Sequence, residues 1–198
     1  KVFISLIQAT NLFEILNNFN KSCNVDVFFA LSHGVHRGVL KTGKTDDRVI
    51  FIKKLKDITP NVKFDLYGLD KVQPIWADHY FKTISNAKMG LNLSRGQAIK
   101  YYSSDRITQI VGNGLVCLID EKTQYRNFFN DKEMVFYKNL NDLSEKILKL
   151  SSDDKTRKLI ARKGKKKYMK YFNSNLVAQF IINKSFGINN RNKYLWSN

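Results

Sequence analysis

The fold is decided by residues 89–120, MGLNLSRGQAIKYYSSDRITQIVGNGLVCLID, which read as strand, polar loop, helix, glycine turn and strand. Residues 89–93 are largely apolar, and residues 115–119 form an unbroken apolar run. A strand that is apolar on both faces is typical of the middle of a parallel sheet with helices on both sides. We therefore expect two central parallel strands joined by a helix over residues 104–113.

The segment between these two strands is rich in hydrogen-bond donors, aromatic rings and guanidinium groups, namely Ser94, Arg95, Tyr101, Tyr102, Ser103, Ser104, Asp105 and Arg106. It follows the carboxyl end of a strand, which is where open α/β sheets bind their ligands. Asn113 and Gly114 supply a left-handed stop for the helix. A helix N-terminus with serines and an arginine beside it suits an anionic group such as a phosphate.

Two motifs in this stretch resemble those of a known enzyme family. Residues 104–114, SDRITQIVGNG, are similar to the S-x-R-x-F-E-x-x-x-x-G segment of the group 1 glycosyltransferases of GT-B fold. Residues 88–95, KMGLNLSR, are similar to a strand of the spore-coat, CgeB-like branch of that family. The order and spacing of the motifs carry the resemblance. It implies the donor-binding half of a bacterial-type, nucleotide-sugar-dependent hexosyltransferase that uses neither a metal nor a cofactor.

Sugar transfer from such a donor requires that the negative charge on the departing diphosphate be neutralised. Arg106, Ser104 and the helix amides suit this task. Arg37 and Lys41, from the glycine-rich loop after the first strand, could assist. Arg95 adds a further guanidinium to the loop before the helix. We expect these side chains to hold the donor phosphates.

The sugar and ribose hydroxyls and the rings of the donor need a second set of groups. Gln109, Asn92 and Asp120 could match the hydroxyls, and Tyr101 or Tyr102 could stack on a base or sugar ring. Many group 1 enzymes have a glutamate where this chain has Gln109, and another where it has Tyr101. The resemblance implies that the first glutamate binds ribose hydroxyls, for which a neutral amide is a weaker acceptor. A degenerate transferase-like domain that only binds a partner or glycan is therefore an alternative.

The length and composition indicate one folded α/β domain. The chain has 198 residues, of which 43% are hydrophobic and 13% aromatic. No apolar run approaches the roughly 20 residues that span a bilayer, and no signal-peptide pattern is present. Cys23 and Cys117 are the only cysteines, and Cys117 lies in a predicted central strand. A reduced, buried thiol is expected for Cys117, which favours a cytoplasmic compartment.

The net charge of +17 has three interpretations. The chain contains 26 Lys, 8 Arg and 20 Asn, a bias that AT-rich coding would produce without any selected partner. An anionic partner, either a membrane that the protein contacts peripherally or an acceptor, is the second interpretation, and a basic nucleic-acid-binding α/β module is the third. Nucleic-acid interfaces prefer arginine to lysine, which weakens the third. The basic helix that begins near residue 151 is expected to dock an apolar stripe and leave its charges on a solvated face.

Three further strands are predicted over residues 25–31, 62–67 and 134–137. Helix starts are indicated by Thr45, Pro74, Asn141, a capping box of Ser151 and Asp154, and either Asn173 or Ser174. Trp76 is expected in the core. The order of elements predicts a doubly wound, Rossmann-like parallel sheet that resembles the C-terminal half of a GT-B glycosyltransferase.

The expected organisation is an incoming segment or linker at 1–24, a nucleotide-sugar-binding domain at 25–186 and a loose C-terminal tail at 187–198. A GT-B enzyme also has an acceptor domain, usually ahead of the donor domain, and 198 residues leave no room for both. An N-terminal acceptor domain outside this chain is therefore expected, with a glycan or a lipid-linked molecule as the acceptor.

Overall fold

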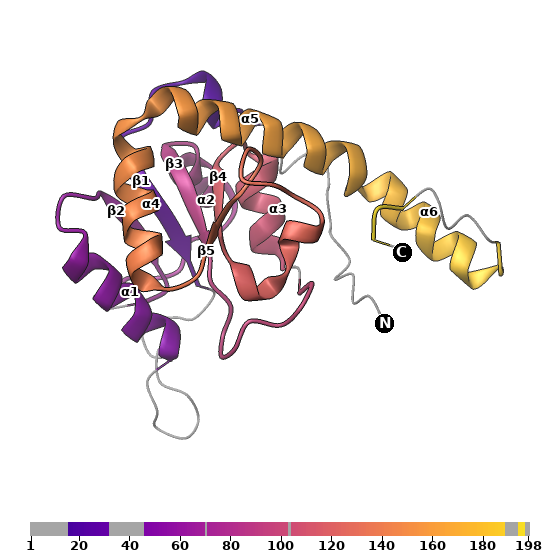
Figure 1. The fold of residues 1–198 in the computed structure, drawn as a ribbon, viewed down its shortest axis with the longest axis horizontal. Helices are drawn as coiled ribbons and strands as arrows, with labels where there is room; N and C mark the ends of the chain where they lie inside the picture. Colours follow the sequence, from indigo (N-terminus) through magenta and orange to yellow (C-terminus); the bar gives the residue numbers. More distant parts are fainter. Residues whose placement is uncertain (1–15, 32–45, 70, 103, 189–193, 197–198) are drawn as a thin grey trace.

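A computed structural model describes residues 16–31, 46–69, 71–102, 104–188 and 194–196. Its centre is a five-stranded sheet in the order β2-β1-β3-β4-β5 (Figure 1). All neighbouring strands are parallel. The strands are β1 (Val25–Ala30), β2 (Phe64–Tyr67), β3 (Ala87–Asn92), β4 (Val116–Asp120) and β5 (Val135–Tyr137). The predicted α/β fold with a parallel sheet is confirmed.

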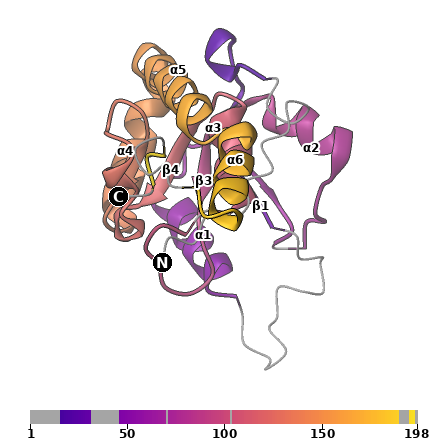
Figure 2. The same cartoon turned by 90° about the vertical axis from the view of Figure 1, so that its right-hand side faces the viewer.

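Helices cover both faces of the sheet. One face packs against α1 (Asp47–Ile58) and α4 (Leu140–Ser152), and the other packs against α2 (Ala77–Ile84) and α3 (Asp105–Gly112). Helix α5 (Asp154–Tyr171) contributes to both cores, and α6 (Ser174–Ser185) extends beyond it, away from the sheet (Figures 1 and 2). Three short 3-10 helices complete the described elements: η1 (Asn18–Asn20), η2 (Glu121–Thr123) and η3 (Tyr125–Asn127).

The central strands are buried on both faces, as their apolar sequences predict. In β4 the side chains of Cys117 and Ile119 lie in one core, and those of Val116 and Leu118 lie in the other. The Cys117 thiol is free and buried. In β3, a Cβ atom on Gly90 would lie 2.4 Å from a side-chain carbon of Ile110. The glycine thus lets α3 pack closely on β3.

Helix α2 differs from the prediction. It begins at Ala77, with Trp76 as the N-cap, so Pro74 lies ahead of the helix rather than in its first turn. Trp76 is 63% exposed, which corrects its expected place in the core. The cause is its position before the first helical residue, outside the apolar stripe that the helix presents to the sheet.

Helix α5 also differs from the prediction in two respects. Its N-cap is Asp153, whose carboxylate accepts a hydrogen bond from the Thr156 amide at 2.9 Å, so the predicted Ser151 capping box is wrong. Its charges are not all solvated. Arg157 is fully buried, and Lys167 forms an ion pair with Glu133 at 2.8 Å. Helix α5 therefore carries structural cations as well as exposed ones.

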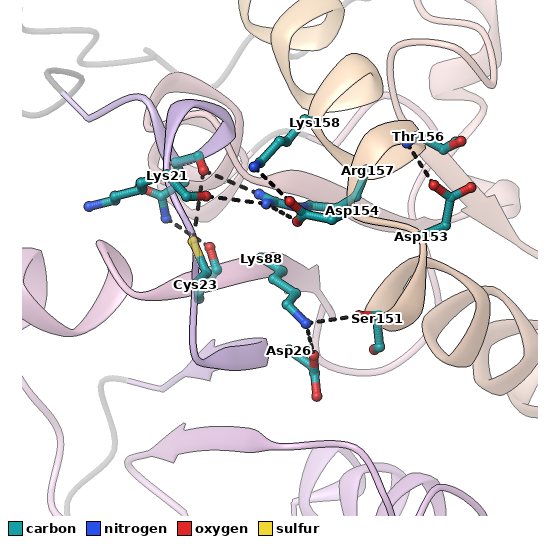
Figure 3. A network of polar contacts seen from close by, with 12 residues as sticks. Lys21, Cys23, Asp26, Lys88, Ser151, Asp153, Asp154, Thr156, Arg157 and Lys158 are labelled. Carbon is teal, nitrogen blue, oxygen red and sulfur yellow. Dashed lines mark hydrogen bonds and ion pairs between the residues drawn. The ribbon is translucent and has the colours of Figure 1, made fainter.

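A polar network holds residues 16–24, the described part of the incoming segment, at the amino ends of β1 and β3 (Figure 3). Arg157 donates to the carbonyl oxygen of Asn18 at 3.2 Å and also contacts Asp154. The buried Asn18 side chain donates to two carbonyl oxygens, those of Ile84 and Ala87, at 2.8 Å each. The free thiol of Cys23 lies beside this network, also buried.

Nearby, Lys88 in β3 bridges the Asp26 carboxylate at 2.7 Å and the Ser151 carbonyl oxygen at 2.8 Å (Figure 3). At the other end of the chain, Tyr194 and Trp196 are buried against the aromatic cluster of α5 and α6, so these two residues are not part of a loose tail. The proposed domain boundaries stay a prediction. None of the helices in the described ranges has the length and apolar character needed to span a bilayer.

Candidate functional site

A cavity of about 430 Å³ opens at the carboxyl end of β1, between α2 and α3. In this strand order the chain leaves β1 towards β2 on one side and later returns to β3 on the other, which makes this place the topological switch point of the sheet. Open α/β sheets bind their ligands at such a point. The described lining residues are Phe28, Ala30, Leu31, Ile75, Trp76, Ala77, Tyr80, Phe81, Ser104, Asp105, Arg106 and Gln109.

Arg106 supplies the positive charge of the cavity wall. It lies in the first turn of α3, half-buried, and its guanidinium donates to the Leu93 carbonyl oxygen at 3.0 Å and to that of Ala30 at 3.5 Å. Its charge also lies over the Phe29 ring, 5.1 Å from the centroid. Burial, and secondarily the nearby Arg48, lower the pKa of the Arg106 guanidinium, which remains protonated at neutral pH.

No carboxylate forms an ion pair with Arg106 within the part of the chain that the structure describes. The neighbouring Arg48 is different. Its guanidinium donates to both carboxylate oxygens of Asp46, at 3.0 and 2.7 Å. These contacts hold the pKa of the Asp46 carboxyl well below its usual range, so Asp46 stays ionised and neutralises Arg48. The charge of Arg106 is thus left available for an anion.

The opposite wall of the cavity is aromatic and comes from α2 and the residues just before it. The Tyr80 ring packs edge-on against Phe28, with 5.4 Å between the centroids, and against Phe81 at 6.0 Å. Burial raises the pKa of Tyr80 to about 12, so its hydroxyl is neutral at physiological pH. Trp76 lies at the exposed rim and is free to stack on a planar ring.

The amino-acid sequence of most of this chain matches the model of a known protein family. The model of a family described as "Glycosyl transferase-like" matches residues 48–183, more than half of the chain. The chain belongs to this glycosyl transferase-like family. The matched span contains α2 and α3, which form the two walls of the cavity. No curated protein sequence matches the chain significantly.

The glycosyltransferase-like domain shares its fold with TarM, a GT-B glycosyltransferase. A crystal structure of TarM superposes with a TM-score of 0.58 at 12% identity, over 91% of this chain and 37% of that chain. A mutant of S. aureus TarM in complex with Fondaparinux, alpha-GlcNAc-glycerol and UDP gives 0.60 at 12% identity, over 91% and 38%. At this identity the likeness shows the fold alone. The glycosyltransferase-like domain spans a little over a third of the length of the TarM chains.

Three of the predicted site residues of this glycosyltransferase-like domain lie together in the cavity wall. These are Ser104, Arg106 and Gln109, all from α3 or its N-cap. Asn92, at the carboxyl end of β3, lies behind them, and its side-chain oxygen accepts a hydrogen bond from the Ser104 hydroxyl at 3.3 Å. Asn92 therefore supports the wall and does not line it.

Three other predicted residues do not line the cavity. Arg95 is exposed in the loop after β3. The Tyr101 ring packs on Phe128, with 5.0 Å between the centroids, so it is engaged away from the cavity. Asp120 caps η2, accepting a hydrogen bond from the Lys122 amide at 2.8 Å. The aromatic side chains that line the cavity come instead from α2 and the residues just before it, among them Trp76, which was expected in the core.

Arg37 and Lys41 lie outside the described residues, so their contact with the donor stays a prediction. In the described ranges, the structure has no cluster of three or more acidic, histidine or cysteine side chains that could hold a metal ion. The described groups at the cavity that could contact a bound anion or ring are Arg106, the first-turn amides of α3 and the aromatic wall.

Proposed function

We propose that this chain is the donor-binding half of a GT-B glycosyltransferase, which transfers a sugar from a nucleoside diphosphate sugar to a glycan or lipid-linked acceptor. The observation that carries the proposal is the half-buried Arg106, which lines the cavity without an ion-pair partner among the described residues. A buried cation without a counterion is costly unless an anion is bound beside it. A diphosphate is an anion of the size that the cavity admits.

The N-terminus of α3 supports the same assignment. Ser104 is the N-cap, but its side chain makes no hydrogen bond to the helix. The first-turn amides can therefore donate to phosphate oxygens, and the helix dipole favours negative charge at this position. As the bond to the sugar breaks, the charge that develops on the leaving diphosphate would be stabilised by Arg106 and these amides.

The aromatic wall would receive a ring of the donor. Trp76 offers an exposed indole face at the rim, beside the apolar side chains of Ile75 and Phe81. Stacking of this kind suits a nucleobase or the apolar face of a sugar. The fold shared with TarM, for which a complex with UDP is known, supports a nucleotide donor.

Several finer features belong to this proposal. The motifs at 88–95 and 104–114 support the CgeB-like branch and a hexosyl donor used without a metal. The short span relative to the TarM chains supports a separate acceptor domain. The boundaries at 25 and 186 are proposed as the limits of the donor-binding domain, within a cytoplasmic protein. Contact with an anionic membrane is a separate proposal, which rests on α5 and α6.

One observation favours a second candidate, a domain that binds a donor or glycan without transferring sugar. Gln109 lies in the cavity wall where many group 1 enzymes have a glutamate, and Tyr101 is turned towards Phe128. Positions 101 and 109, where many group 1 enzymes have glutamates, therefore carry no carboxylate in this chain. Sugar transfer or donor hydrolysis by the full-length protein would exclude this candidate, whereas nucleotide binding without turnover would favour it.

Tryptophan fluorescence tests the proposed donor site. Trp76 and Trp196 are the only tryptophans, and Trp196 is buried in the C-terminal aromatic cluster. A nucleoside diphosphate from a panel of UDP, GDP and ADP should quench the fluorescence saturably, because its ring stacks on Trp76. The Trp196→Phe control should keep the quenching, and Trp76→Phe should lose it.

The same panel distinguishes the proposed function from its competitor. A chain that shows no quenching and no thermal stabilisation with any nucleotide, but is stabilised by single-stranded oligonucleotides, would be a nucleic-acid-binding module. Stabilisation by a nucleoside diphosphate with quenching confined to Trp76 would support the donor site.

A further inference from the structure

The positive charge of the chain is unevenly distributed. Residues 155–198 contain twelve Lys and Arg residues and no Asp or Glu, whereas all 17 acidic residues lie before position 155. A coding bias towards lysine and asparagine would act along the whole sequence and does not account for the absence of acids from this part. The excess of basic residues in the C-terminal helices therefore needs an explanation other than coding bias.

The exposed cations of α5 lie on one face of the helix. They recur at helical spacing, opposite the buried side chain of Arg157, and they are Lys155, Arg162, Lys163, Lys166 and Lys170. The face runs for roughly 22 Å at 1.5 Å per residue. Among the described residues, the ion pairs of α5 involve other cations: Arg157 and Lys158 pair with Asp154, and Lys167 pairs with Glu133. We call these five exposed residues the basic face.

The helix that follows ends in exposed apolar side chains. Ile182 is 54% exposed and Phe186 is 78% exposed, and the spacing of four residues puts them on the same side of α6. Ile181, in the last turns of α6, and Ile188, just beyond its end, are also exposed. The other side of α6 is packed, with the Phe180 ring 5.1 Å from that of Tyr194. We call Ile181, Ile182, Phe186 and Ile188 the apolar tip.

We propose that the basic face and the apolar tip bind this protein to the surface of an anionic membrane. Lysines near such a surface are attracted to the lipid phosphates, and exposed aliphatic and aromatic side chains insert at the boundary of headgroups and acyl chains. The combination favours lipid over nucleic acid, because a phosphodiester backbone offers no apolar partner for the tip. The basic face contains one arginine against four lysines, which agrees with this choice.

The position of the two surfaces fits this use. The first part of α5 lies at the amino ends of the strands, where Arg157 contacts the incoming segment, and α6 continues away from the sheet (Figures 1 and 3). The cavity lies at the opposite edge, at the carboxyl end of β1. A membrane bound at the basic face would leave the cavity open, so this inference is independent of the proposed donor site.

Vesicle co-sedimentation of the full chain tests the electrostatic part. The protein should pellet with phosphatidylcholine vesicles that contain phosphatidylglycerol, remain free with phosphatidylcholine alone, and be released by salt. Reversal of Lys163, Lys166 and Lys170 to glutamate should lower the partition coefficient about tenfold or more. The matched control reverses Lys54, Lys56 and Lys149, which are exposed on α1 and α4, and should change it by less than about threefold.

A second pair of variants tests the apolar part. Changing both Ile182 and Phe186 to serine should weaken binding to the same vesicles by about tenfold. Ile50→Ser, at an exposed position of α1, should leave it unchanged. All substituted side chains are exposed, and circular dichroism verifies that the variants are folded.

Three outcomes would overturn the proposal. Equal losses from the two lysine triples would show attraction by net charge alone. Full binding by the Ile182 and Phe186 variant would exclude insertion of the tip. Binding of single-stranded oligonucleotides that outcompetes the vesicles, with a salt slope that the α5 triple loses, would assign the basic face to nucleic acid.

Discussion

Replacing Arg157 with methionine should lower the free energy of unfolding by about 2–4 kcal/mol, since each buried polar group left without a partner costs about 1–3 kcal/mol. The guanidinium is fully buried and donates to the carbonyl oxygens of Asn18 and Lys21, at 3.2 and 3.5 Å. Methionine fills much of the volume but donates no hydrogen bond. Asp154 retains Lys158 at 2.6 Å, so the loss comes mainly from the carbonyl groups.

Urea unfolding measures this change, and Arg162→Met is its matched control. Arg162 belongs to the same helix but is exposed, with its guanidinium over the Phe19 ring at 5.4 Å. Its loss should cost less than about 1 kcal/mol. If both variants lost the same stability, Arg157 would not be holding the incoming segment.

Replacing Arg106 with alanine should weaken nucleoside diphosphate binding by about 1.5–3 kcal/mol, the range for hydrogen bonds to charged groups. The guanidinium is held at the cavity by the Leu93 carbonyl oxygen and faces no carboxylate among the described residues. Because the lost interaction is with the phosphates, binding of the corresponding nucleoside should change much less. Calorimetry with both ligands separates the two effects.

Arg95→Ala is the control for this prediction. Arg95 is exposed in the loop before α3 and does not line the cavity, so its removal should leave the affinity within about twofold. An unchanged affinity in a folded Arg106→Ala protein would remove Arg106 from the donor site. A large loss of affinity in the Arg95→Ala variant would indicate that the phosphates bind nearer to the loop between β3 and α3.

The central strands were predictable because a strand that is buried on both faces has an uninterrupted run of apolar residues. Residues 115–119 are apolar without interruption, and the structure places β4 within this stretch and the residue after it, between two strands and two helix layers. The N-terminal end of α3 was predictable for a similar reason. A serine, an arginine and a glycine stop frame a helix whose N-terminus must lie at the carboxyl edge of a parallel sheet.

The helical spacing of Arg157 indicates burial, but its residue type and its neighbours suggest exposure. Arg157 lies three residues before Ile160, seven before Gly164 and eleven before Tyr168, all of which are buried. That spacing marks the inner side of a helix. Within a run of nine cations the residue type suggests a solvated charge, and only the three-dimensional packing of the incoming segment shows what the guanidinium binds.

Trp76 and Tyr101 could not be placed from sequence, because each depends on where a helix or turn begins. Trp76 precedes the first residue of α2, and its indole is exposed rather than packed in the core. Tyr101 has a φ of 57° in the turn before α3, and its ring packs on Phe128 from a segment well beyond it in the sequence. Contacts between distant segments decide such cases.

The rates at which the two buried thiols react with an alkylating reagent would report on two different opening motions of this protein. Burial raises the pKa of Cys117 to about 12 and also raises that of Cys23, so neither forms the reactive thiolate while it is enclosed. Cys117 is reached by an alkylating reagent only when β4 leaves the sheet, which requires global unfolding. We expect Cys23, whose thiol contacts the Asn18 carbonyl oxygen, to be reached once residues 16–24 detach from Arg157. The labelling rate of Cys23 thus reports on local detachment of this segment, and that of Cys117 reports on global unfolding of the domain.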